Sequence, residues 1–190
     1  VSWKEGAPVN FSLEGIGVEL AVQGVFSFVG KAAFFQTDEA SGFRGSLKLS
    51  LDSVGLTIDV GIMVGRMNDG TFFFYLFIDV DLPVGIPLFS TGAALYGFAG
   101  LLAGNLQPAR IDAEHWYYGY YKRQPVGVTG PEKWAVKRDA FAIGVGTTIG
   151  SLPDTGYAIS AKVLLILSLP GPRILLQGKG SFIEKKPENK

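Results

Sequence analysis

The chain has 190 residues, of which 47% are hydrophobic and 18% charged, and its 17 basic residues match its 17 acidic ones in number. This length suits a single domain with its own core, and the apolar content excludes intrinsic disorder. A formal net charge of zero provides no global field to attract a polyanion, so nucleic acid is not an expected partner. Cysteine is absent, which excludes disulfides, thiolate metal sites and cysteine nucleophiles.

Neither the apolar stretches nor the start of the chain indicates a helical membrane anchor. The longest apolar stretch, Ala93 to Gly104, is interrupted by glycine and is shorter than the roughly 20 residues that a spanning helix needs. The chain begins at Val1 instead of an initiator methionine, and its first residues show no signal-peptide pattern. We therefore expect it to be a piece of a longer protein.

Apolar and polar residues alternate in segment after segment, and clusters of Gly, Asp, Asn and Pro separate these segments, which predicts antiparallel β-strands. The expected fold is all-β, with less than about one-fifth helix. It is an antiparallel meander of long, glycine-bulged strands that forms a curved sheet, a sandwich or an open barrel. A single domain is expected over residues 1–183, followed by a polar tail at 184–190. The expected strands include Ile16 to Phe28, two segments on either side of a phase slip at Asp52-Ser53, Thr71 to Leu82, Phe141 to Gly150, Tyr157 to Leu169 and Ile174 to Ile183.

One hairpin can be predicted in detail, because Asn68-Asp69-Gly70 separates two alternating segments. A three-residue loop with a left-handed glycine is a favoured hairpin connection, and here it pairs Met67 with Thr71. The resulting register places Val60 opposite Ile78, so the apolar faces of the two strands coincide.

The strand from Thr71 to Leu82 is apolar on both faces near this turn. One face carries Phe72, Phe74, Leu76 and Ile78, and we expect it to be the core face. The other carries Phe73, Tyr75 and Phe77, which one sheet cannot bury against the same core. Because rings of this size lose much stabilisation in water, we expect the second set to be covered by another segment, a partner or lipid. The segment from Val163 to Leu167 is apolar on both faces as well and is expected to be a covered central strand.

Residues 110–139 differ in kind from the rest and predict an aromatic and charged insertion, with a short helix at Ile111 to Tyr121 as one alternative. Rings mixed with cations suit a binding surface or a loop folded over the sheet end. His115 is the only histidine, so neither a typical zinc site nor an equipped serine triad is available, and no cofactor is implied. The candidate binding residues are Phe73, Tyr75, Phe77, Trp116, Tyr117, Tyr118, Tyr120 and Tyr121.

The same hairpin register sets Asp59 opposite Asp79, with Asp81 next on the same face. Like charges directly opposed, about 5 Å apart, destabilise a sheet unless water, a cation or a shared proton relieves them. That spacing also suits retaining glycoside hydrolysis, or two ligands of a calcium ion, for which Asp59, Asp79 and Asp81 are the candidates. We favour a solvated sheet face without catalytic or metal function, in which replacing Asp79 with Asn relieves repulsion.

Three segments in the second half of the chain together resemble a family of large, uncharacterised, β-rich microbial proteins. They are Ala93 to Gly100, Phe141 to Gly150, and Val163 to Leu169 followed by Pro170-Gly171-Pro172. The resemblance implies that the chain is part of a longer β assembly and assigns no functional residue.

The leading functional hypothesis is a non-enzymatic, β-rich structural or binding module of a larger protein. It would present an apolar sheet face to other segments or chains of the assembly, or to lipid or a membrane. One alternative is a segment of an outer-membrane-type β-barrel, which one-faced strands and aromatic clusters favour but doubly apolar strands disfavour. Another is a carboxylate-dependent hydrolase that uses Asp59 and Asp79.

Overall fold

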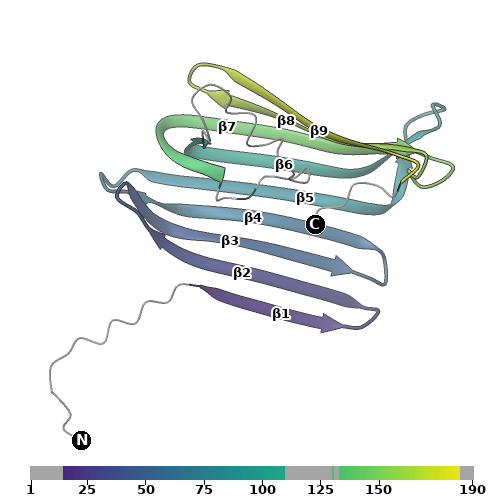
Figure 1. The fold of residues 1–190 in the computed structure, drawn as a ribbon, viewed down its shortest axis with the longest axis horizontal. Coiled ribbons are helices and arrows are strands. Elements are labelled where there is room, and N and C mark those ends of the chain that lie inside the picture. Colours follow the sequence, from purple (N-terminus) through teal and green to yellow (C-terminus); the bar gives the residue numbers. More distant parts are fainter. Residues whose placement is uncertain (1–14, 110–129, 131–132, 185–190) are drawn as a thin grey trace, which may run out of the picture.

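All regular structure in the described part of the chain is β-strand (Figure 1). The computed structural model describes residues 15–109, 130 and 133–184. The strands pair in chain order as one nine-stranded antiparallel sheet, with β1 and β9 at its edges, which confirms the predicted all-β meander. No helix within these ranges is long and apolar enough to cross a bilayer. The strands are β1 (Ile16–Val22), β2 (Phe26–Gln36), β3 (Ala40–Leu51), β4 (Leu56–Met67), β5 (Phe72–Pro87), β6 (Ala93–Pro108), β7 (Trp134–Ser151), β8 (Ile159–Leu169) and β9 (Arg173–Phe182).

The hairpin between β4 and β5 has the predicted register. Val60 lies opposite Ile78, and the backbone N–H of Met67 donates to the carbonyl of Thr71 over 2.9 Å. Gly70 has a φ of 86°, a left-handed conformation that favours glycine at the end of this loop.

The single strand expected from Ile16 to Phe28 is wrong, because the chain turns between β1 and β2. Val22 pairs with Phe26 across a three-residue loop that contains Gly24 at a φ of 74°. A loop of this length returns even-numbered residues to the same face, so the alternation continues through the turn and conceals it. The slip at Asp52-Ser53 is likewise a turn, and Leu51 pairs with Leu56 across it.

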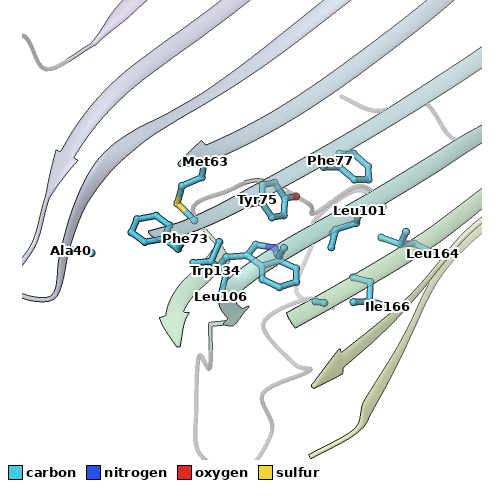
Figure 2. Packing of buried hydrophobic residues seen from close by; sticks show 12 residues of the cluster. Ala40, Met63, Phe73, Tyr75, Phe77, Leu101, Leu106, Trp134, Leu164 and Ile166 are labelled. Carbon is cyan, nitrogen blue, oxygen red and sulfur yellow. The ribbon is translucent and has the colours of Figure 1, made fainter. Parts of the chain in front are cut away.

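The face of β5 that is buried is the opposite of the one expected. Phe73 and Tyr75 are 0% exposed, whereas Phe72 is 51% and Ile78 40% exposed. Figure 2 shows the buried set meeting on one side of the sheet, where side chains from β3 to β8 converge. We call this side the inward face and the other the outward face. The inward cluster consists of Ala40, Met63, Phe73, Tyr75, Phe77, Leu101, Ala103, Leu106, Trp134, Ala142, Leu164 and Ile166.

Two further expectations are modified by the structure. Strand β8 is buried on one face only, because Leu164 and Ile166 lie in the core while Leu165 is 42% exposed on the outward face. Strand β7 begins at Trp134, inside the range 110–139 assigned to the insertion. The helix proposed at Ile111 to Tyr121 lies outside the described residues.

Glycine contacts provide a test of the inward packing. A Cβ on Gly65 would overlap the Ser41 carbonyl oxygen and the Phe73 ring, whereas one on Gly100 meets no atom within 4 Å. We predict that Gly65→Ala lowers the free energy of unfolding by about 1–3 kcal/mol, as overpacking does. Gly100→Ala is the matched control and should be neutral or slightly stabilising. Urea unfolding followed by circular dichroism measures both, and equal effects of the two substitutions would contradict this packing.

Candidate functional site

The outward face carries an unbroken apolar surface across all nine strands. The strand register aligns its residues in rows that run perpendicular to the strands. One row consists of Val18, Gly30, Leu47, Val60, Ile78, Gly100, Val145, Leu165 and Leu176. Its neighbour consists of Ile16, Ala32, Gly45, Ile62, Leu76, Leu102, Ile143, Leu167 and Ile174. No polar side chain interrupts either row.

Aromatic residues appear in the two rows that flank these two central rows. Toward one end the row is Phe34, Phe43, Val64, Phe74, Gly104, Phe141 and Leu169. Toward the other it is Leu20, Phe28, Leu49, Ile58, Val80, Phe98, Thr147, Val163 and Gly178. Together these rows are the apolar band, whose one polar side chain is that of Thr147.

The apolar band is open to its surroundings even in the middle of the sheet. Val145 is 62% exposed, although β7 has a paired strand on each side. Folded monomers rarely leave a contiguous apolar surface of this extent in water, and such surfaces mark interaction sites. The band is therefore the main candidate site.

The inward face instead holds a buried group of charges that spans β5 and β8. The Lys162 ammonium lies 2.6 Å from Oδ2 of Asp79 and 3.1 Å from Oδ1 of Asp81. Lys162 is 3% exposed and Asp79 2% exposed, so this ion pair is removed from solvent. The predicted opposition of Asp59 and Asp79 is present, but the solvated sheet face favoured for it is wrong.

Small residues on β6 and β7 allow Lys162 to reach this pair. Strands lie about 4.8 Å apart, so β5 and β8 would be separated by roughly 14 Å in a flat sheet, too far for the two side chains to meet. The contact therefore requires the sheet to curve toward the inward face. Gly97 lies in the path, and a Cβ there would stand 3.0 Å from Oδ1 of Asp81.

The surroundings of the ion pair are buried, and some of the polar atoms there have no hydrogen-bond partner among the described residues. Burial raises the pKa of the Asp81 carboxyl; Lys162 opposes this shift, and the charge of Asp79 adds to it. The hydroxyls of Thr148 and Ser160 are buried beside Lys162, without a hydrogen-bond partner in the described part of the chain. The inward face thus holds two nearly inaccessible charges, Lys162 and Asp79, beside two buried hydroxyls.

The three aspartates that the sequence singled out as candidate metal ligands lie on one face of the sheet. Asp59, Asp79 and Asp81 share the inward face, but among the described residues no group of three acidic or histidine side chains is arranged to hold a metal. Sequence reasoning missed Lys162, although it is the charged residue among the inward positions Ser160, Lys162, Leu164 and Ile166 of β8. That break in the pattern was the available signal.

The predicted aromatic binding residues are placed differently from the expectation or are not described. Phe73, Tyr75 and Phe77 are core residues, and the Tyr75 ring lies 5.3 Å from that of Trp134. His115 and the candidates Trp116, Tyr117, Tyr118, Tyr120 and Tyr121 lie outside the described residues.

Comparisons with protein-family models, with curated proteins and with solved structures found no match. The function is therefore argued from geometry and chemistry alone.

The buried ion pair predicts a specific pattern of stability changes. Lys162→Met leaves Asp79 buried without its cation, and we expect the free energy of unfolding to fall by about 3–5 kcal/mol. Asp79→Asn should also destabilise, but less, because Lys162 keeps Asp81. The sequence analysis, which considered only the repulsion between Asp59 and Asp79, predicted the opposite effect of Asp79→Asn on stability.

The double variant Lys162→Met with Asp79→Asn should recover much of the loss, since no charge is then left buried without a partner at Asp79. Lys179→Met, on the strand next to Lys162 and exposed, is the control and should change stability by less than about 0.5 kcal/mol. Urea midpoints provide the measurement, and an unaltered midpoint for Lys162→Met would show that the pair is dispensable.

Proposed function

We propose that this chain is a non-enzymatic structural module whose apolar band faces lipid acyl chains, as the wall of an outer-membrane-type β-barrel does. The observation that carries the proposal is the band itself, which crosses every strand of the sheet without a charged side chain. The chain would then act by separating a lipid environment from an interior.

Lipid fits this band better than a protein partner does. Protein interfaces carry about one hydrogen bond per 100–200 Å² and have polar rims. The central rows of the band offer no side-chain donor or acceptor, and the sheet satisfies its backbone groups internally except at its edges. Acyl chains require neither donors nor acceptors, so they match what the band presents.

The dimensions of the strands agree with this assignment. A strand that crosses a bilayer needs about 9–11 residues when tilted. Strands β2 and β8 have 11 residues each, β9 has 10, β3 and β4 have 12, and β5, β6 and β7 have 16 to 18, so all of these are long enough. Strand β1, with 7 residues, is shorter. Aromatic residues at the two borders of the apolar band are also a feature of such walls.

The distribution of charge also indicates that the outward face meets lipid and that the inward face meets the interior. Lys48, Asp59, Asp79 and Lys162 all belong to the inward face, so the charges of these strands lie inward, beside the inward cluster, and the outward positions are apolar. The inward apolar residues of β5 and β8, which argued against a barrel in the sequence, fill the hollow of the curved sheet. Narrow barrels fill their interiors with side chains in this way.

The two edge strands of the sheet would need further strands to pair with in the proposed wall. Within the described residues β1 and β9 each pair on one side only. Both edges keep the outward apolar pattern, with Val18 and Leu20 on β1 and Ile174 and Leu176 on β9. Further strands, from other parts of a larger assembly, would continue the wall at these edges.

No observation favours the hydrolase alternative. Asp79 is buried and paired with Lys162, so this carboxylate is closed to a substrate, whereas the opposed Asp59 is half-buried.

A charge placed on either face tests the proposal. We predict that the unaltered chain floats with phosphatidylcholine vesicles, and that Ile78→Lys weakens this association at least about tenfold, because a lysine in the middle of a lipid-facing strand costs about 2–4 kcal/mol. Thr57→Lys adds the same charge to the inward face, opposite Asp81, and should leave the association unchanged. A chain that remains monodisperse in buffer and does not associate with vesicles would refute the proposal.

A further inference from the structure

Arg66 is the charged residue that lies directly at the border of the apolar band. It follows Val64 on the outward face of β4 and pairs with Phe72 of β5. One of its guanidinium nitrogens, Nη1, donates a hydrogen bond to the carbonyl of Gly70 over 3.0 Å, which holds the group at the hairpin end. In the described part of the chain no carboxylate forms an ion pair with it. Its remaining donors are available to an anion.

A hollow of about 660 Å³ adjoins this guanidinium. Its volume lies within the usual range of about 300–1,000 Å³ for small-molecule sites. Its wall is chiefly aromatic and aliphatic, with polar groups near Arg66. The apolar part includes Phe34, Phe43, Val64 and Phe72, and the polar part Gln36, Ser41 and Arg66. A ligand that suits this wall has an apolar body and an anionic end.

We propose that the hollow binds an anionic phospholipid, with the phosphate group at Arg66 and the first part of an acyl chain against Phe34, Phe43 and Phe72. This inference rests on the proposed function and specifies its lipid. A guanidinium binds phosphate through two parallel hydrogen bonds, which an ammonium cannot reproduce. Its place one row beyond the end of the apolar band, beside Phe72, is the depth at which headgroups lie against a lipid-facing strand.

Arg44 provides a matched control at the same end of the sheet. It belongs to the inward face, opposite Met63, and its guanidinium lies 5.9 Å from the centre of the Phe35 ring. Arg44 carries the same charge on the opposite face and does not line the hollow itself, although its neighbour Phe35 does. Any effect of general charge should be shared by the two arginines, whereas a headgroup site should depend on Arg66 alone.

The test compares flotation of the full chain with vesicles of phosphatidylcholine and with an equimolar mixture of phosphatidylcholine and phosphatidylglycerol. One basic residue near an anionic surface changes partitioning by about fivefold. We expect the unaltered chain and Arg44→Gln to prefer the mixture, and Arg66→Gln to lose about fivefold of that preference. Arg66→Lys, which keeps the charge and is the milder change, should lose part of it.

Each outcome decides the inference. Binding to both vesicles with an unchanged preference in Arg66→Gln, or with an equal loss in Arg44→Gln, overturns the headgroup site and leaves the proposed function standing. A chain that binds inorganic phosphate through Arg66 but shows no preference for the mixed vesicles has a site for the free ion, which also overturns the inference. Failure to bind either vesicle overturns the proposed function itself.

Discussion

The contact between Lys162 and Asp79 determines how the rest of this sheet is arranged. It joins β8 to β5 above two intervening strands, and it forms only when the sheet curves toward the inward face. The two strands between them carry small residues on the inward face, at Gly97, Ala99 and Gly146. These leave space for the Lys162 side chain to extend toward β5. A lysine and a carboxylate that are each nearly inaccessible to solvent are costly to separate, so the direction of curvature is strongly specified.

The curvature in turn decides which apolar residues are covered. On the concave side, the rings of Phe73 and Tyr75 meet Trp134 and become core. On the convex side, residues such as Ile78 and Val145 have no facing layer among the described residues and remain partly exposed. A fold of one curved sheet can bury only its concave side, and its convex side then requires another environment. A surface without charge matches lipid, which is the environment we propose for it.

The sequence predicted what depends on neighbouring residues and failed where distant segments meet. The alternation and the Asn68-Asp69-Gly70 loop were sufficient for the register of β4 and β5, including Val60 opposite Ile78 and Asp59 opposite Asp79. The turn between Val22 and Phe26 was missed because its loop preserves the alternation. The core face of β5 was assigned to the wrong side, since both sides are apolar and only the curvature distinguishes them. That curvature depends on Lys162, more than eighty residues away from Asp79 in sequence, and alternation carries no information about such a contact.

The central claim is that the apolar band, and not the inward face, contacts the hydrocarbon of a bilayer. The chain has no cysteine, so single cysteines can be labelled with a fluorophore without background. The informative positions are Leu47 and Val145 in the central row of the band, and Ser46, which precedes Leu47 but belongs to the inward face. Quenching by lipids brominated in the acyl chain should be strong at Leu47 and Val145 and weak at Ser46. Equal quenching at Leu47 and Ser46, or none at Val145, would contradict this account.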